Sequence, residues 1–101
     1  NLKQVRLKES EIAIIKLEGR KQFGSGAKFF IFGSRADDKK RGGDIDIYIE
    51  TDVKRDVLKK KIKFLVDVKK EIGERKIDVV INNHTSKKLI YDVAKSEGIR
   101  I

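Results

Sequence analysis

The sequence predicts the α/β (α+β) fold class, with a small mixed β-sheet flanked by helices. Three observations support this prediction. Apolar residues recur at helical spacing in several segments, short apolar or strictly alternating segments lie between them, and the two kinds of segment follow one another along the chain. The expected order is α-β-(short α)-β-α-β-α. Because single domains usually contain about 100 to 150 residues, we expect residues 1–101 to form a single domain.

The N-terminal part of the chain predicts the first helix and the first strand. A stripe of isoleucine and leucine residues at helical spacing predicts a helix over residues 10–21, with Ser10 as its N-cap. A glycine-containing break follows. The apolar run over residues 27–32 then predicts a buried strand that ends at Gly33.

The middle of the chain predicts a strand, a long helix and another strand. Residues 44–50 alternate between polar and isoleucine side chains, which is typical of a strand with two different faces. Apolar residues at a 3.6-residue spacing predict a helix over residues 54–72, and Gly73 is expected to end it. The β-branched run over residues 77–81 predicts the third strand.

The C-terminal part predicts a last helix over residues 86–97. Thr85 or Ser86 is expected to be its N-cap, and Gly98 is expected to end it. The tail over residues 98–101 could add a short strand.

Chain connectivity predicts the strand directions. The strand–helix–strand unit over residues 44–81 should form a right-handed crossover, which makes its two strands parallel. Only residues 33–43 connect the first strand to the second, fewer than a crossover needs. These two strands are therefore expected to be antiparallel, with the short helix in the polar stretch between them.

Composition excludes several classes of site. The chain contains no cysteine, which excludes disulfides, thiolate zinc sites and a cysteine nucleophile. His84 is the single histidine, so a histidine-rich metal site is excluded as well. Any metal ion must therefore be bound by oxygen ligands.

The charge balance favours anionic partners. Lys and Arg number 25 against 16 Asp and Glu, which gives a net charge of +9. The positive charge could serve nucleotide phosphates or an acidic partner protein, and the same composition also describes an ordinary solvated surface. Nucleic acid is a weaker alternative, because the lysines are spread along the chain and few aromatic residues are present for stacking.

The chain has no segment that predicts membrane association. No apolar run approaches the roughly 20 residues of a membrane-spanning helix, and the Lys-rich N-terminus lacks the apolar core of a signal peptide. We therefore expect no membrane partner and a cytoplasmic location.

Three aspartates interrupt the predicted strands. Asp44 and Asp46 lie two residues apart on one face of a strand, with their backbones about 7 Å apart. Asp78 lies in an otherwise apolar strand, where an ionised carboxylate is costly without a compensating partner. If the two strands are neighbours, the three carboxylates can converge, and Mg²⁺ would relieve their repulsion. An Asp-x-Asp pair alone is equally compatible with a solvated strand face.

A possible phosphate site precedes these aspartates. The apolar strand ends in Gly33-Ser34 and leads into a polar stretch that could open a helix. Backbone N–H groups at such a turn bind phosphate, glycine permits close approach, and the serine hydroxyl adds a donor.

Together these motifs resemble a known superfamily. The run Phe32-Gly33-Ser34-Arg35-Ala36, a spacer, the run Gly43-Asp44-Ile45-Asp46-Ile47 and the later strand with Asp78 are similar to the DNA polymerase beta-type nucleotidyltransferases. Within that superfamily, the chain resembles the minimal nucleotidyltransferases (MNT) that are encoded beside HEPN proteins as toxin–antitoxin pairs. The resemblance covers nearly the whole chain and implies the nucleotidyltransferase, polymerase beta palm-like fold.

The resemblance implies roles for the aspartates. Asp44 and Asp46 would bind Mg²⁺, with two ions expected, and Asp78 would complete the catalytic triad of carboxylates. Asp78 would act as a ligand of the second metal ion or as the general base, and the sequence leaves both roles open.

The resemblance also implies a nucleotide-binding segment. Gly33 and Ser34 would hold the triphosphate, and Arg35 and Arg41 are candidates for phosphate contact. The chain departs from the family pattern at one point: the family often has Arg-Gly soon after Gly-Ser-x-Ala, whereas here residues 37–41 read Asp-Asp-Lys-Lys-Arg.

The implied function is Mg²⁺-dependent transfer of a nucleoside monophosphate, AMP from ATP, to a hydroxyl of a macromolecular acceptor. The acceptor would be a HEPN partner toxin, which the chain would neutralise as its antitoxin. The alternative is a non-catalytic antitoxin or binding module that neutralises its partner by direct association. Homo-oligomer formation is also left open.

Further residues carry alternatives. His84 is a weaker candidate for a general base, and Tyr48 could stack on a nucleotide base, although packing under the last helix is the commoner use of such a residue. Phe23, Phe29 and Leu89 could be exposed and form an interface.

Overall fold

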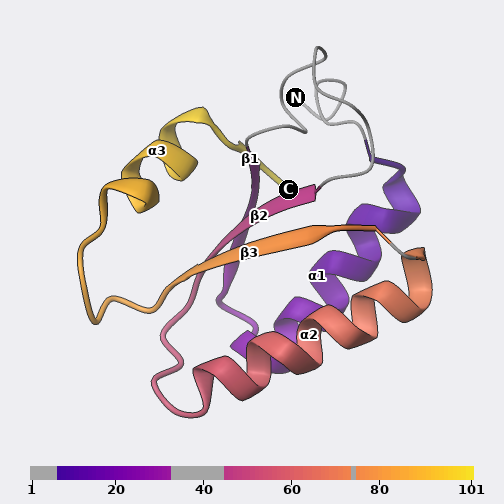
Figure 1. Cartoon of the computed structure of the whole chain (residues 1–101), viewed down its shortest axis with the longest axis horizontal. Helices are drawn as coiled ribbons and strands as arrows, with labels where there is room; N and C mark the ends of the chain where they lie inside the picture. The colour runs from indigo at the N-terminus through magenta and orange to yellow at the C-terminus, as the bar shows by residue number, and fades with distance from the viewer. Residues whose placement is uncertain (1–6, 33–44, 74) are drawn as a thin grey trace.

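The computed structural model describes residues 7–32, 45–73 and 75–101. The elements run in the order α1 (Glu9–Phe23), β1 (Lys28–Phe32), β2 (Ile45–Glu50), α2 (Val57–Ile72), β3 (Ile77–Asn82), α3 (Leu89–Glu97) and β4 (Ile99–Arg100), as Figure 1 shows. This order agrees with the prediction, including the short strand in the tail. The predicted short helix falls outside the described residues.

The strands form one mixed sheet in the order β3-β2-β1-β4. β2 and β3 pair in parallel, whereas β1 pairs antiparallel with β2 on one side and with β4 on the other. Both predicted strand directions are therefore confirmed. β3 and β4 are the two edge strands.

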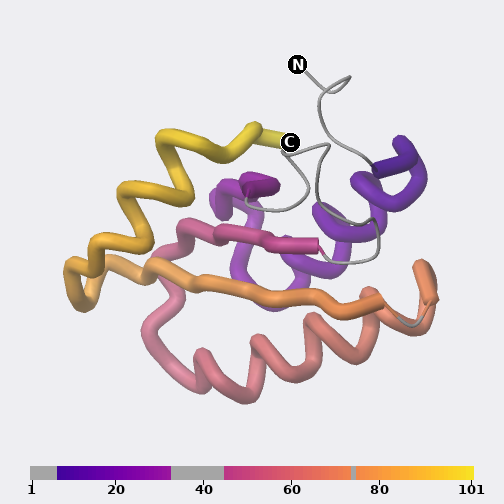
Figure 2. The backbone as a smooth tube through the Cα atoms, turned by 45° about the horizontal axis from the view of Figure 1, so that its top comes forward, coloured from indigo at the N-terminus to yellow at the C-terminus, as the bar shows by residue number. Residues whose placement is uncertain are grey.

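Alternation along the strands separates two faces of this sheet. On one face, the isoleucines of β2 pack with Phe29, Ile31, Ile77 and Val79 of the neighbouring strands in a core that α1 and α2 cover. On the other face, Tyr48 and Phe30 pack against Ala94 of α3. Figure 2 shows the strands between α3 above and α2 below. The sheet is thus the middle layer of the molecule.

The starts of α2 and α3 differ from the prediction. α2 begins at Val57 and not at 54, because Asp56 has a left-handed backbone (φ 53°) and Asn83 donates from Nδ2 to the carbonyl of Val53 at 3.0 Å. α3 begins at Leu89 and not at 86. His84 donates its N–H to Asn82 Oδ1 at 3.0 Å, and Thr85 donates to Asn83 Oδ1 at 2.7 Å. These local hydrogen bonds favour a turn over an earlier helix start.

The N-cap predictions were wrong for both terminal helices. Lys8 occupies the N-cap position of α1, and Ser10 lies within the helix. The N–H of Lys8 donates to Glu11 Oε1 at 2.9 Å, so a side chain within the first turn serves the helix start. Lys88 occupies the N-cap position of α3, in place of Thr85 or Ser86.

Only one of the three apolar residues that could have formed an exposed interface is in fact exposed. Phe23 and Phe29 are buried in the core and cannot form an interface, whereas Leu89 is 78% exposed. None of the helices in the described ranges is both long enough and apolar enough to cross a membrane.

Candidate active site

Two of the three predicted catalytic carboxylates lie side by side. Asp46 of β2 and Asp78 of β3 are register partners on parallel strands, which lie about 4.8 Å apart in a sheet. Register partners project to the same face, here the face that also holds Tyr48 and α3. Asp46 is half-buried, and Asp78 is exposed on the edge strand.

The end of β1 lies at the same level of the sheet. Phe32, the last residue of β1, is the register partner of Asp46. Phe32, Asp46 and Asp78 therefore form one row across three strands. The row lies at the N-terminal ends of β2 and β3 and at the C-terminal end of β1.

The remaining predicted site residues are Gly33, Ser34, Arg35, Arg41 and Asp44, and all of them lie outside the described residues. Within the described ranges, no group of three or more His, Asp or Glu side chains could hold a metal ion. The described part of the chain therefore contributes two carboxylates, Asp46 and Asp78.

A polar cluster that sequence reasoning missed lies on the same face. Tyr48 is 1% exposed, and its hydroxyl donates to Glu50 Oε2 at 2.8 Å. Asn82 Nδ2 donates to that hydroxyl at 3.1 Å, and Lys95 Nζ of α3 lies 3.3 Å from Glu50 Oε2. We call Tyr48, Glu50, Asn82 and Lys95 the tyrosine cluster. It joins β2, β3 and α3.

The packing of Tyr48 excludes a stacking role for it. Its ring lies 5.5 Å from that of Phe30 and 6.1 Å from that of Tyr91, between the sheet and α3. A ring that is almost fully covered cannot receive a nucleotide base. Of the two predicted uses, packing under the last helix is therefore the one that the structure has.

The tyrosine cluster lowers the pKa of Glu50 and raises the pKa of Tyr48. Burial alone would raise the pKa of the Glu50 carboxyl, but hydrogen bonds from Tyr48 and Lys95 outweigh burial and lower it. Burial raises the pKa of Tyr48 to about 12; the Glu50 carboxylate adds to the shift, and the Asn82 hydrogen bond opposes it. At neutral pH, a charged Glu50 therefore accepts a hydrogen bond from a neutral Tyr48.

The alternation of Tyr48 and Glu50 along β2 was visible in the sequence, because it places both side chains on one face. Their partners were not visible. Asn82 and Lys95 reach them only through strand pairing and through the docking of α3 on the sheet.

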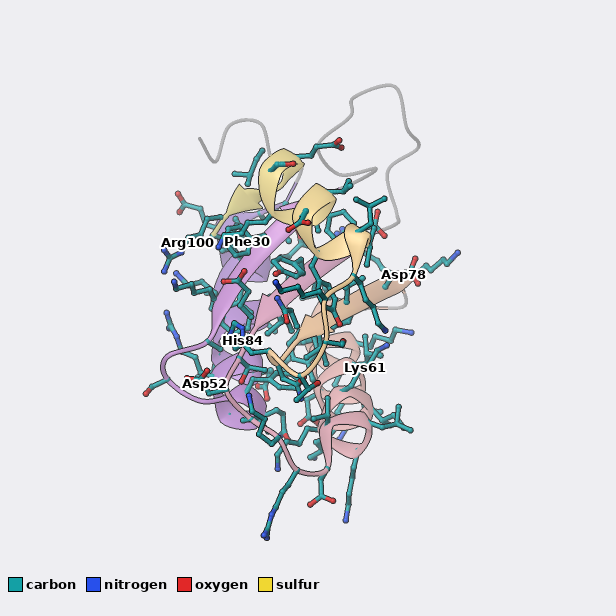
Figure 3. The ribbon with its side chains drawn as sticks, turned by 90° about the vertical axis from the view of Figure 1, so that its left-hand side faces the viewer. Phe30, Asp52, Lys61, Asp78, His84 and Arg100 are labelled. Atoms are coloured by element: carbon teal, nitrogen blue, oxygen red, sulfur yellow. The ribbon has the colours of Figure 1, made fainter. Side chains whose placement is uncertain are left out.

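His84 does not lie near the carboxylates. β3 ends at Asn82, which lies four residues or roughly 13 Å from Asp78 at the rise of a strand, and His84 follows beyond that end. Figure 3 shows Asp78 and His84 at opposite ends of the strand, with His84 beside Asp52. His84 Nε2 lies 3.8 Å from Asp52 Oδ1. The idea of His84 as general base is therefore wrong.

Comparison with known proteins supports the interpretation of the fold. The family model described as "Nucleotidyltransferase domain" matches residues 12–101, nearly the whole chain. A search of curated proteins finds no significant match. The three helices and the four-stranded mixed sheet of the described part are consistent with a nucleotidyltransferase fold. The chain therefore belongs to the nucleotidyltransferase domain family of the DNA polymerase beta-like superfamily.

Proposed function

We propose that this nucleotidyltransferase transfers AMP from ATP to a hydroxyl of a macromolecular acceptor, and that Asp44, Asp46 and Asp78 are its catalytic residues. Membership of the family supports nucleotidyl transfer in general. The observation that carries the proposal for the site is the register pairing of Asp46 with Asp78 on one face of the sheet.

The donor set fits Mg²⁺. Asp46 and Asp78 offer carboxylate oxygens from neighbouring strands, and carboxylates are the side-chain ligands that this ion prefers. Asp44 precedes Asp46 by two residues and would add a third carboxylate. When bound at these residues, two Mg²⁺ ions would supply neutralisation of phosphate charge and activation of the acceptor hydroxyl.

The transfer itself is a substitution at the α-phosphorus of ATP. The acceptor oxygen forms a bond to this phosphorus, the bond from phosphorus to the β-phosphate oxygen breaks, and pyrophosphate leaves. The hydroxyl proton must pass to a base. Asp78 is exposed on the edge strand, so an acceptor can reach it, and it serves as this base or as a metal ligand.

The triphosphate is assigned to Gly33, Ser34, Arg35 and Arg41. Support comes from the end of β1, because Phe32 is level with Asp46 and Gly33 follows Phe32 in the chain. Backbone N–H groups, the serine hydroxyl and the two guanidinium groups are all donors suited to phosphate oxygens.

The acceptor we propose is a HEPN partner protein, which the chain would modify and so neutralise as an antitoxin. This part rests on the resemblance of the motifs. The alternative is neutralisation by association alone, without chemistry. Two carboxylates in register on one face favour catalysis, because an association surface has no need of two like charges so close together.

Calorimetry tests the site before any acceptor is known. ATP, CTP, GTP and UTP are titrated with and without Mg²⁺ into the wild type and into the Asp46→Asn, Asp78→Asn double variant. Asp52→Asn is the matched control, because Asp52 is an exposed carboxylate at the other end of the strands. Mg²⁺-dependent binding of ATP that is lost only in the double variant is the expected result.

ATP that carries a radiolabel at the α-phosphorus, the atom transferred with AMP, then tests the acceptor. Label should appear on a HEPN protein with the wild type and not with the double variant. Transfer retained by the double variant would contradict the catalytic assignment. Neutralisation of the HEPN protein by the double variant, with no label transferred, would favour the non-catalytic alternative.

A further inference from the structure

α2 carries a second apolar stripe that the core does not use. Leu58, Ile62 and Val66 recur every four residues, which places them on one face of the helix. They are 69%, 54% and 46% exposed, whereas Phe64 and Val68 of the same helix are fully buried. α2 is therefore apolar both toward the core and toward solvent.

Part of this stripe lies in a hollow of about 520 Å³ between α2 and the end of α1. We call it the α2 groove, and its lining residues are Gln22, Asp56, Lys59, Lys60, Ile62, Lys63 and Val66. Two aliphatic side chains provide its apolar surface. Three lysines against one aspartate give its rim a positive charge, although Lys63 also pairs with Asp67 at 3.2 Å.

We propose that the α2 groove docks an amphipathic helix of a partner protein, with an apolar stripe flanked by Glu and Asp. Apolar side chains of the partner would cover Ile62 and Val66, and its acidic flanks would meet Lys59 and Lys60. This is the helix-in-groove mode of recognition, in which apolar anchors supply affinity and complementary charges select the partner.

The same features disfavour two other occupants. A second copy of this chain would bring the lysines of two grooves together, and each copy already carries a net charge of +9. A membrane surface is disfavoured by shape, because Ile62 and Val66 line a hollow and the chain has no tryptophan to insert at a lipid interface.

The position of the groove has a consequence for activity. α1 and α2 cover one face of the sheet, whereas Asp46 and Asp78 lie on the opposite face with Tyr48 and α3. A helix in the α2 groove therefore leaves the carboxylates open. Docking at this groove and nucleotidyl transfer should be separable, and the docking proposal does not depend on the transfer proposal.

A pair of synthetic helical peptides tests the proposal. Each has about the 16 residues of α2, leucines at helical spacing and a fluorescent label, and the two differ only in having Glu or Lys beside the leucines. Fluorescence anisotropy should give micromolar affinity for the acidic peptide and at least about tenfold weaker binding for the basic one.

Variants locate the binding. Ile62→Asp should weaken binding of the acidic peptide at least about tenfold, and Leu89→Asp, at an exposed leucine on α3, should leave it unchanged. Lys59→Glu combined with Lys60→Glu should shift the preference toward the basic peptide. Circular dichroism checks that each variant is folded.

Three results would overturn the proposal. The first is equal affinity for both peptides, or no binding of either. The second is binding to phosphatidylserine vesicles, without peptide binding, that Ile62→Asp abolishes. The third is self-association in sedimentation, again without peptide binding, that the same variant abolishes.

Discussion

Asp46 and Asp78 are register partners on two parallel strands and face the same side of the sheet, at the level where β1 ends. Two like charges in this arrangement repel each other. A cation or a cationic ligand between them relieves the repulsion. We therefore expect Asp78 to contribute more to ligand binding than to the stability of the free protein, and that distinction can be measured.

The first prediction tests whether Asp78 contributes to ligand binding or to the stability of the free protein. Asp78→Asn should leave the free energy of unfolding without ligand within about 0.5 kcal/mol of the wild-type value, because the residue is exposed. If Asp78 is a metal ligand, the variant should nevertheless lose the rise in melting temperature that we expect ATP with Mg²⁺ to produce in the wild type. Urea denaturation measures the free energy of unfolding and differential scanning fluorimetry measures the melting temperature, with Asp52→Asn as the control in both. An undiminished ligand-induced shift in Asp78→Asn would contradict Asp78 as a metal ligand and leave only the role of general base.

The positions of Asp46 and Asp78 could be predicted from the sequence, whereas other features of the site could not. Strict alternation along residues 44–50 predicted which side chains share a face, and the crossover rule predicted that β2 and β3 are parallel, so Asp46 and Asp78 were expected to converge. The pairing of Lys95 with Glu50 depends on how α3 docks on the sheet, which no local sequence pattern reports. The starts of α2 and α3 were missed because single hydrogen bonds, such as that from Asn83 to the carbonyl of Val53, determine them.

The second prediction concerns the hydroxyl of Tyr48. Tyr48→Phe should destabilise the protein by about 1–3 kcal/mol, because a buried hydroxyl that bonds a charged carboxylate and the Asn82 amide is lost. Urea denaturation measures the change. Tyr91→Phe removes the same group from the neighbouring ring and should have a smaller effect. Equal effects of the two substitutions would mean that the hydrogen bonds of Tyr48 contribute little.

The third prediction concerns how the free energy of unfolding depends on pH in the acid range. The folded protein lowers the pKa of Glu50 below its ordinary value of 4.5, so the folded state favours the carboxylate. The resulting stability is present above pH 4.5 and is lost as the pH falls through the lowered pKa. The difference in unfolding free energy between wild type and Glu50→Gln should therefore shrink on acidification. Urea denaturation at a series of acid pH values checks this, and a constant difference would argue against the shift.

The fourth prediction concerns the ionisation of Tyr48 and its effect on stability in the alkaline range. The folded protein raises the pKa of Tyr48 from 10.0 to about 12, so the folded state favours the neutral phenol. Its contribution to stability is present below pH 10.0 and is lost as the pH rises toward about 12. Absorbance titration should show one of the two tyrosines ionising near pH 12, and Tyr48→Phe should remove that step. A single step near pH 10 for both tyrosines would be incompatible with the tyrosine cluster.

The last prediction tests how closely α1 packs against the sheet. A Cβ at Gly19 of α1 would lie 2.3 Å from Cε1 and 2.6 Å from Cζ of Phe29, a ring that is only 2% exposed. Gly19→Ala should therefore destabilise the protein by about 1–3 kcal/mol through overpacking, although alanine is favoured over glycine within helices by roughly 1 kcal/mol. Gly26→Ala is the matched control, since nothing lies within 4 Å of a Cβ there.

Thermal and urea unfolding of the two alanine variants provide the measurement. Helix propensity favours alanine at this position, whereas the contact with Phe29 opposes it, so the sign of the change in stability shows which effect is larger. A stabilised Gly19→Ala would mean that α1 lies farther from Phe29 than the structure has it. Combining Gly19→Ala with Phe29→Leu should recover part of the lost stability, because the smaller side chain makes room for the new methyl group. If the two substitutions were merely additive, the loss would have a cause other than this contact, and the tight packing of α1 on β1 would need revision.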